Sequence, residues 1–301
     1  MCRIIYAEDS PIIPRDIQTI KNRIKELLVT EDISSIDVIA VQGGNSLSRN
    51  YCVSFHNQPL FFAKVYPCRN GDYPLLQKIM GTISNGDKLV AVFRIGNNCC
   101  LITNWIEGSG VHGTVSEAQQ TARILQSIHA MPVPIKARSS DVYVELLHYR
   151  IYLSVHQVNF PHKVEITSFL KENSGLSRNE TTLTHGDVHQ GNLIVDSRGT
   201  VHLVDYENFA VRDPWRDFVY TCFFHARSEN PFWKEVLQTY FNGHVPAQFW
   251  ATMKYYCYLH LLRMVICEHQ KGNSKTIDLL ANSIWKGWNC KTDSLPKWVL
   301  A

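Results

Sequence analysis

The stretch HGDVHQGN, residues 185–192, decides the fold that this sequence predicts. Two apolar runs follow it, Leu193 to Val195 and Val201 to Val204, with the turn sequence Asp-Ser-Arg-Gly between them. Apolar runs on either side of such a turn predict a β-hairpin, with Asn192 at its first end and Asp205 at its last. Amide and carboxylate oxygens are the hard ligands that Mg²⁺ prefers. The hairpin is therefore a candidate magnesium site.

The spacing from Asp187 to Asn192 equals that in the H-x-D-x-x-x-x-N catalytic loop of protein kinases. In that loop the Asp accepts the proton of the acceptor hydroxyl, and the Asn binds magnesium together with a later Asp. Two other interpretations stay open. His185 and His189 flank Asp187 and could belong to a metal hydrolase, although no third cluster of ligands lies nearby in the sequence. The stretch could also be a turn whose histidines are only hydrogen bonded.

Residues 185–192 resemble the H-G-D-x-H-x-x-N signature of the aminoglycoside phosphotransferase and choline kinase superfamily. Val204-Asp205-Tyr206-Glu207 resembles the second motif of that superfamily. The resemblance implies an α+β, protein-kinase-like fold with two lobes, a small N-terminal antiparallel-sheet lobe and a larger, mainly helical C-terminal lobe. It also implies ATP, Mg²⁺ and a small molecule that accepts phosphate on a hydroxyl. Asp187 would be the catalytic base, and Asn192 and Asp205 would bind the metal.

One lysine, Lys64, lies within an apolar strand pattern. It resembles the lysine of the A-x-K strand of kinases, which contacts the nucleotide phosphates. Alternation along a strand would place it on the same face as Phe62 and Tyr66. The alternative is a lysine on an edge strand that faces solvent.

Kinases orient this lysine with a glutamate on the next helix, and here the sequence departs from the pattern. No Glu occurs between Lys64 and Glu107. The helix predicted over residues 73–83 offers Asp72 near its start and Gln77 within it. Either the lysine has an unusual partner, or the phosphates alone hold it.

The resemblance implies two further nucleotide contacts. A glycine-rich turn lets backbone N–H groups face an anion, so the turn at Gly44, Asn45 and Ser46 would cover the phosphates. An ordinary hairpin turn is the alternative. The adenine would lie against the backbone of a short linker, which begins around Asn104, Trp105 and Ile106. The expected organisation is a nucleotide-binding lobe over residues 1–104, a hinge over 105–110 and a catalytic, acceptor-binding lobe over 111–301.

Apolar periodicity predicts the other elements. Strands are expected at 36–41, 51–55, 60–65, 88–95 and 99–103, and helices at 14–28, 116–129, 141–158, 160–172, 215–227, 232–242, 246–269 and 276–288. Ser116 with Gln119 is the predicted cap of its helix, and Asp213 caps a helix that starts at Pro214. Asp217 is predicted to brace the catalytic loop. The aromatic residues of the C-terminal helices favour a packed core over a cage for a quaternary amine.

Composition limits the classes of function. The chain has 301 residues, 45% of them hydrophobic, and a formal charge of +3, which is too mild to indicate a nucleic-acid partner. No signal peptide and no membrane span is predicted. The nine cysteines form no C-x-x-C pair. A cytoplasmic monomer or weak dimer with free thiols is therefore expected.

The acceptor does not follow from the sequence, and neither does the choice between ATP and GTP. From Asp205 onward nine acidic residues stand against eleven basic ones, whereas a site for a polycationic aminoglycoside should favour acids. An aminoglycoside-type or other antibiotic is the first expectation, on family frequency alone. A choline-like or other metabolite kinase is the second. A nucleotide-binding pseudokinase is the alternative from another class.

Overall fold

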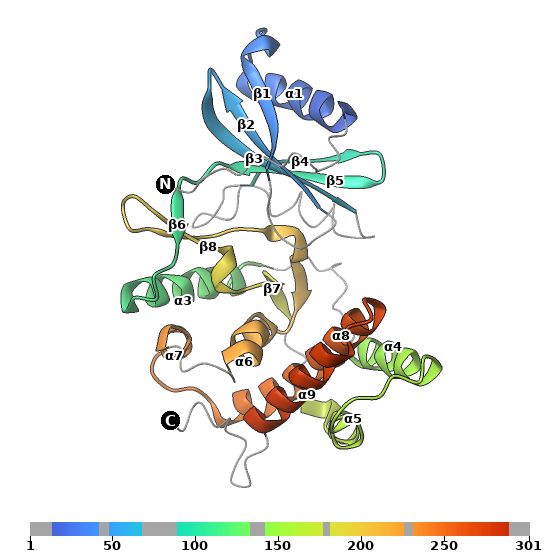
Figure 1. Cartoon of the computed structure of the whole chain (residues 1–301). Helices are drawn as coiled ribbons and strands as arrows, with labels where there is room; N and C mark the ends of the chain where they lie inside the picture. The colour runs from blue at the N-terminus through green and yellow to red at the C-terminus, as the bar shows by residue number, and fades with distance from the viewer. Residues whose placement is uncertain are drawn as a thin grey trace. The chain divides into compact units, whose positions relative to one another are not determined.

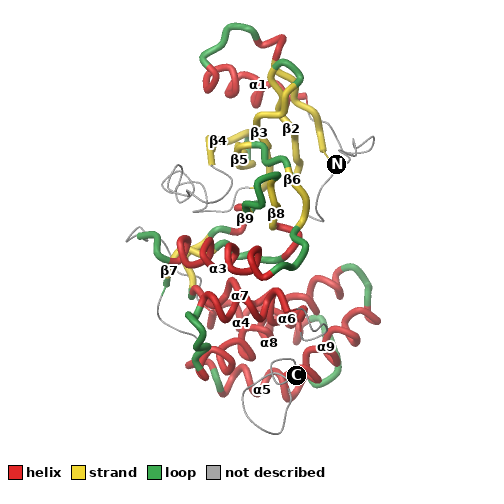
Figure 2. Tube along the Cα trace, turned by 90° about the vertical axis from the view of Figure 1, so that its left-hand side faces the viewer, coloured by secondary structure: helices red, strands yellow, loops and turns green. Residues whose placement is uncertain are grey.

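The computed structural model describes residues 14–41, 48–67, 89–132, 142–176, 181–225 and 231–288. The chain forms two compact units, one from residues 1–111 and 191–207, the other from 112–190 and 208–301. Strands dominate the first unit and helices the second (Figure 2). The predicted α+β class, with an antiparallel sheet in one unit and mainly helices in the other, is confirmed. The lobe boundaries expected at residues 104 and 111 stay predictions, as does the helix over 73–83, which lies outside the described residues.

The first unit is built on a five-stranded antiparallel sheet, whose strands have the order β1-β2-β3-β5-β4 (Figure 1). Helix α1 spans Pro14–Leu28 and contacts β1. The strands are β1 (Ile36–Val41), β2 (Arg49–Phe55), β3 (Gln58–Pro67), β4 (Leu89–Ile95) and β5 (Asn98–Asn104). Each overlaps a strand predicted from apolar alternation.

Helix α1 helps to build an apolar core on one face of this sheet. Ile20 and Ile24 of the helix belong to the same buried cluster as Ala63 and Val65 of β3. Because side chains alternate along a strand, Lys64 lies on the opposite face, where it is only 7% exposed. Strand β3 pairs on both sides, with β2 and with β5. The alternative of a solvent-facing lysine on an edge strand is therefore wrong.

The predicted hairpin is present in the first unit. Strand β8 (Leu193–Asp196) pairs antiparallel with β9 (Val201–Leu203). A third strand that the sequence analysis missed, β6 (Gly108–Gly110), pairs with β8, so part of the expected hinge is a strand. Glycine is required at Gly108, because a Cβ there would lie 2.2 Å from the carbonyl oxygen of Val195.

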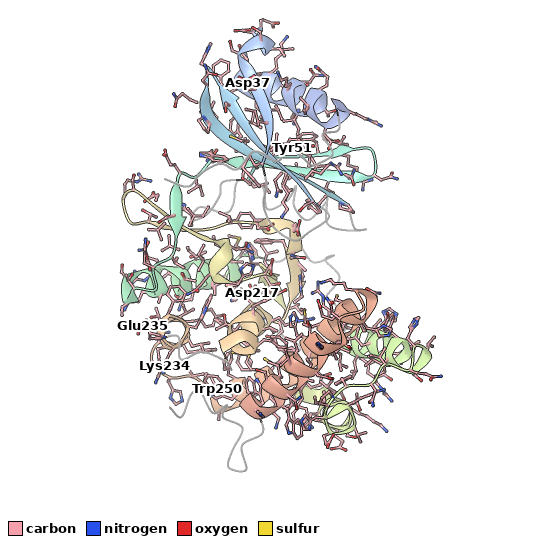
Figure 3. The ribbon with its side chains drawn as sticks, in the orientation of Figure 1. Asp37, Tyr51, Asp217, Lys234, Glu235 and Trp250 are labelled. Carbon is pink, nitrogen blue, oxygen red and sulfur yellow. The ribbon has the colours of Figure 1, made fainter. Side chains whose placement is uncertain are left out.

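The second unit is mainly helical. Its helices are α3 (Val115–His129), α4 (Val142–Val155), α5 (Lys163–Glu172), α6 (Val219–His225), α7 (Pro231–Tyr240), α8 (Ala247–Gln270) and α9 (Ser274–Trp288). A two-stranded sheet, β7 (Thr182–Thr184) with β10 (Ala210–Arg212), completes it. Aromatic residues fill the core around α8, where Trp250, Tyr255 and Tyr256 are at most 5% exposed (Figure 3). The predicted aromatic core is thus confirmed.

Two expectations from composition can be compared with the described residues. None of their helices combines the length and apolar character that a membrane crossing needs. Cys52, Cys100, Cys222, Cys257 and Cys267 are free thiols, as expected. Cys99 is disulfide-bonded, so the expectation of free thiols throughout is wrong at this residue.

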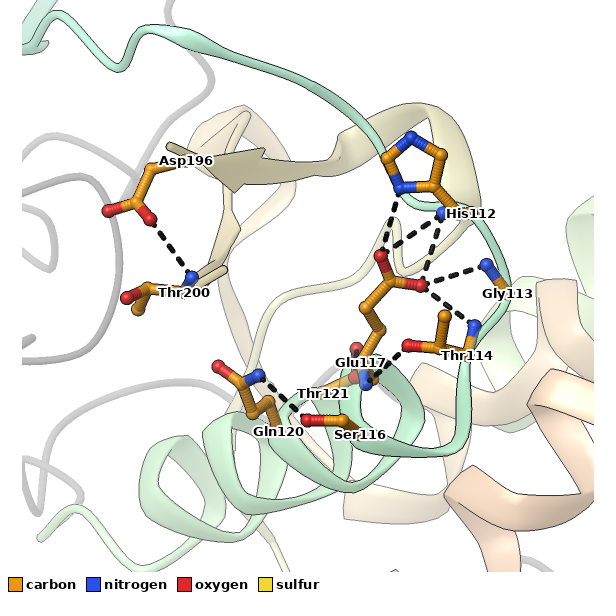
Figure 4. A network of polar contacts seen from close by, with 9 residues as sticks. All are labelled: His112, Gly113, Thr114, Ser116, Glu117, Gln120, Thr121, Asp196 and Thr200. Carbon is orange, nitrogen blue, oxygen red and sulfur yellow. Dashed lines mark hydrogen bonds and ion pairs between the residues drawn. The ribbon is translucent and has the colours of Figure 1, made fainter. Parts of the chain in front are cut away.

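The cap of α3 lies two residues before the predicted one (Figure 4). Thr114 accepts a hydrogen bond from the backbone N–H of Glu117, 3.2 Å away. The carboxylate of Glu117 in turn accepts from the backbone N–H groups of Thr114 and Gly113, each at 2.8 Å. This is a capping box, which satisfies N–H groups that have no partner within the helix. Ser116 was the wrong choice because it already lies inside the first turn.

We expect the two hydroxyl residues to differ in their effect on stability. Thr114→Ala should lower the free energy of unfolding by about 1 kcal/mol, as for other lost N-caps. Ser116→Ala, the matched control, should change it by less than about 0.5 kcal/mol. Urea denaturation of both variants measures the difference. Equal losses would contradict the assignment of the cap to Thr114.

Candidate active site

The candidate site of the first unit centres on the buried ammonium group of Lys64. Its Nζ lies 2.7 and 2.8 Å from the two carboxylate oxygens of Asp205. A second carboxylate, that of Glu207, lies 3.1 Å from the same nitrogen. One ammonium and two carboxylates leave a formal charge of −1, which favours the approach of a cation. The sequence analysis identified Lys64 and Asp205 as site residues but named Glu207 only as part of the second motif, without a role.

The open end of the hairpin positions these carboxylates. The backbone N–H of Val204 donates to the carbonyl oxygen of Asn192 over 2.9 Å, which holds the two ends of the hairpin together. Asp205 then turns the chain with a positive φ of 73°, a conformation that Asp tolerates better than most residues. The buried Tyr206 anchors the turn that follows, since its hydroxyl donates to the carbonyl oxygen of Leu203 at 2.7 Å.

The donors at this end of the hairpin fit magnesium. Asn192 and Asp205 present an amide oxygen and a carboxylate, and Mg²⁺ in phosphoryl-transfer sites is held by one or two carboxylates together with phosphate oxygens. Within the part of the chain that the structure describes, no group of three or more His, Cys, Asp or Glu residues could hold a metal ion. The metal-hydrolase interpretation therefore finds no ligand set there.

In the second unit, Asp217, which is labelled in Figure 3, braces the loop that carries Asp187. The sequence predicted this role. Its carboxylate accepts hydrogen bonds from the backbone N–H groups of His185 and Gly186, at 2.8 and 2.6 Å. His129 contributes a ring nitrogen 3.0 Å from the same carboxylate. Burial alone would raise the pKa of Asp217, but the contacts with His129 and Gly186 hold that pKa below its ordinary value.

Gly186 is the point at which this loop needs glycine. Its φ is +81°, and a Cβ there would lie 2.5 Å from the carbonyl oxygen of Asn208. The guanidinium of Arg212 would lie 2.7 Å from that Cβ. The adjacent His185 is fully buried and packs edge-on against Phe209, with ring centroids 5.8 Å apart. These contacts agree with a structural role for His185 in supporting the loop.

Asp187 itself has polar neighbours, of which the sequence analysis named His189 but not Tyr220. A ring nitrogen of His189 lies 3.7 Å from its carboxylate. The pKa of Tyr220 is raised, mainly by burial. The nearby charge of Asp187 and a hydrogen bond with its side chain raise this pKa further. The ring of Tyr220 also packs 4.9 Å from that of His260, whose pKa is lowered to about 3 by burial and by Arg263. Nothing in the spacing of Tyr220 and His260 marks them in the sequence.

The remaining predicted nucleotide contacts can be located only in part. Gly44, Asn45 and Ser46 lie outside the described residues, as do Asp72 and Gln77. Asn104 is the last residue of β5, and Trp105 and Ile106 follow it. The backbone N–H of Trp105 donates to the carbonyl oxygen of Leu60 over 2.8 Å, so this group already has a partner within the first unit.

A buried lysine on the third strand of an antiparallel sheet, paired with a carboxylate after a hairpin, defines a kinase-like phosphotransferase fold. The family model of the Phosphotransferase enzyme family matches residues 96–255, more than half of the chain, and the protein therefore belongs to that family. It is accordingly a phosphotransferase, an enzyme that transfers a phosphate group.

Solved structures share this fold at low sequence identity. A thermostable mutant of aminoglycoside phosphotransferase APH(4)-Ia, in a ternary complex with AMP-PNP and hygromycin B, has 13% identity and a TM-score of 0.64 over 87% of this chain and 96% of its own. Spectinomycin phosphotransferase APH(9)-Ia, in complex with ADP and spectinomycin, has 14% identity and a TM-score of 0.58 over 95% of this chain and 97% of its own. Choline kinase LicA from Streptococcus pneumoniae has 16% identity and a TM-score of 0.59 over 89% of this chain and 98% of its own. Comparison with curated proteins finds no similar sequence.

Gly186 should be far more sensitive to substitution than a glycine that has a similar backbone conformation but open space around it. Gly186→Ala should lower the free energy of unfolding by more than about 2 kcal/mol, because backbone strain and a steric clash add. Gly199, with a φ of +78° and no atom within 4 Å of where a Cβ would lie, is the matched control. Gly199→Ala should cost about 1 kcal/mol from strain alone. Chemical denaturation measures both, and similar losses would show that the loop can relax.

The charge of Asp217 should stabilise the fold at neutral pH and stop doing so in acid. Because its pKa in the folded state lies below 3.8, the unfolded chain takes up the proton first as the pH falls. Its contribution is therefore complete above about pH 5 and is lost as the pH falls through 3.8 toward the folded pKa.

We test this with Asp217→Asn, which should lower the free energy of unfolding by about 3 kcal/mol at pH 7. The gap to the wild type should shrink below pH 3.8. Asp278→Asn, at an exposed position of α9, is the control and should change stability by less than about 0.5 kcal/mol. A gap that stays constant from pH 7 to pH 3 (about four units, which spans the titration range of Asp) would contradict a role for the charge.

Proposed function

We propose that the protein is an ATP- and Mg²⁺-dependent phosphotransferase whose first candidate acceptor is a hydroxyl of an aminoglycoside-type or other antibiotic. The observation that carries the proposal is the pairing of the buried Lys64 with Asp205, at 2.7 Å, because these two residues occupy the lysine and metal-ligand positions of the kinase motifs. The complexes of APH(4)-Ia with AMP-PNP and hygromycin B, and of APH(9)-Ia with ADP and spectinomycin, support the nucleotide and the acceptor class.

In this proposal Asn192 and Asp205 would hold Mg²⁺, which when bound would neutralise charge on the phosphates. Lys64 would contact the nucleotide phosphates from the sheet. The turn at Gly44, Asn45 and Ser46 would cover the phosphates, and the backbone at Asn104, Trp105 and Ile106 would face the adenine.

Asp187 would orient the acceptor hydroxyl and accept its proton. An ionised carboxylate suits this role because it only accepts hydrogen bonds and has no proton of its own to donate. Asp217 fixes the backbone immediately before it, at Gly186, and the hydroxyl of Tyr220 hydrogen-bonds the Asp187 side chain. The base would thus be held from both its main chain and its side chain.

A metabolite kinase is the second candidate, and one observation favours it. The carboxylates of Glu145, Asp213 and Asp217 are all engaged within the second unit, where Glu145 pairs with Arg216 at 2.9 Å and Asp213 accepts from Tyr256 at 2.8 Å. Carboxylates that are already paired contribute little to the attraction of a polycation. Choline kinase LicA has a similar fold, so metabolites belong in the same assay panel as antibiotics.

Nucleotide turnover against a panel of aminoglycosides, macrolides, choline and sugars tests the function. Mg²⁺ with ATP should raise the melting temperature, because a ligand that binds only the folded state stabilises it, and EDTA should remove most of that gain. Phosphorylation of one panel member identifies the acceptor class. A Mg-dependent thermal shift without turnover on any acceptor would favour the pseudokinase alternative, and no shift at all would contradict the nucleotide site.

The assigned roles of the two aspartates predict different kinetic defects. Asp187→Asn keeps the shape but cannot accept a proton, so turnover should fall by about 10²- to 10⁴-fold while Mg-ATP affinity changes little. Asp205→Asn removes a metal-binding charge and should weaken nucleotide binding as well as turnover. Equilibrium nucleotide binding and steady-state turnover measure the two effects separately. Near-normal turnover in Asp187→Asn would sink the assignment of the base.

A further inference from the structure

The sequence lacks the glutamate that kinases use to orient the strand lysine, since no Glu occurs between Lys64 and Glu107. We propose that Glu207, two residues after the metal-binding aspartate, takes over this task and is the positioning residue for Lys64. This inference rests on the proposed function, because it concerns how the lysine meets nucleotide phosphates. It transfers the orienting carboxylate from the helix after β3 to the turn after β9.

The contact between the two side chains is direct and shielded from solvent. The Nζ of Lys64 lies 3.1 Å from Oε2 of Glu207, and the two side chains are only 8% and 16% exposed. Asp205, the other partner of the lysine, is 26% exposed. Coulomb attraction grows as the surroundings become less polar, so the burial of Glu207 strengthens its hold on the ammonium.

The backbone keeps Glu207 in place independently of the lysine. Glu207 lies in a short 3₁₀ turn, Tyr206–Asn208. Tyr206 is 2% exposed, and its hydroxyl donates to the carbonyl oxygen of Leu203 at 2.7 Å. A carboxylate on an anchored turn loses little conformational entropy when it binds the ammonium. The turn can therefore do what the helix does in kinases that carry the usual glutamate.

Asp205 cannot serve this purpose alone, because the proposed function assigns its oxygens to the metal. Both of these oxygens lie within 2.8 Å of Lys64. Once the metal occupies these oxygens, the lysine needs a second carboxylate to hold it. Glu207 supplies that second carboxylate, 3.1 Å from Nζ of Lys64.

A double-mutant cycle between Lys64 and Glu207 tests the inference, with the equilibrium dissociation constant of Mg-ATP as the readout. Glu207→Gln should weaken Mg-ATP binding by about tenfold in the wild-type background, through a lysine that is no longer held for the phosphates. In the Lys64→Met background the same change should have less than about a twofold effect, because residues that act through each other are not additive. Glu207→Asp should recover part of the loss.

Two controls separate positioning from other roles. Glu165→Gln, at an exposed position of α5, makes the same chemical change and should leave Mg-ATP binding unaltered. The Mg²⁺ concentration for half-maximal ATP binding should be the same with and without Glu207, since Glu207 is not proposed to bind the metal. The melting temperature of each variant, measured without nucleotide, shows whether it is folded.

The outcomes are distinguishable. An equal loss of affinity in both backgrounds, or a Glu207→Gln variant that needs several times more Mg²⁺, would overturn the inference and leave the proposed function intact. A wild-type protein that binds no Mg-ATP would overturn the proposed function, and the inference with it.

Discussion

A single buried ammonium group organises the first unit of this protein. Lys64 projects from the central strand β3, on the face opposite the core that α1 covers, and meets the carboxylates of Asp205 and Glu207. An unpaired buried charge is strongly destabilising, so the lysine requires these partners. The contact joins residues 141 positions apart in the chain and thereby ties the hairpin to the sheet. Much of the geometry around the candidate metal ligands follows from that one constraint.

The second unit solves a different problem, that of holding a short loop in a strained conformation. The carboxylate of Asp217 does so by accepting hydrogen bonds from the backbone N–H groups of His185 and Gly186. The contact with His129 offsets the free-energy cost of burying this carboxylate. The positive φ of Gly186 is tolerated only because the residue has no side chain. Asp217 and Gly186 thus fix the backbone position of the neighbouring Asp187, although neither contacts a reactant in our proposal.

The parts of the structure that the sequence predicted are those with strong local patterns. The apolar run placed β1 at Ile36–Val41 without error. The Asp213-Pro214 pair marked the start of the 3₁₀ helix Pro214–Phe218, where the Asp213 carboxylate accepts from the backbone N–H of Trp215. Strand β6 could not be predicted, because Gly-Ser-Gly has no apolar pattern. These residues form a strand by pairing with β8, which lies far away in the sequence. The cap of α3 was misplaced because two neighbouring hydroxyl residues fit the same rule. The role of Glu207 escaped notice because its partner lies far away in the chain.

The path of the chain between the two units has a consequence for how the protein is made. The first unit is not continuous, since residues 191–207 return to it after residues 112–190 have contributed to the second. A ribosome must therefore synthesise the chain as far as Asp196 before β6 can pair with β8. It must reach Glu207 before Lys64 can meet both of its carboxylates. Until then the nascent N-terminal sheet carries a buried-type lysine without its partners. Long-range contacts of this kind slow folding, because the intervening chain must be brought together before they form.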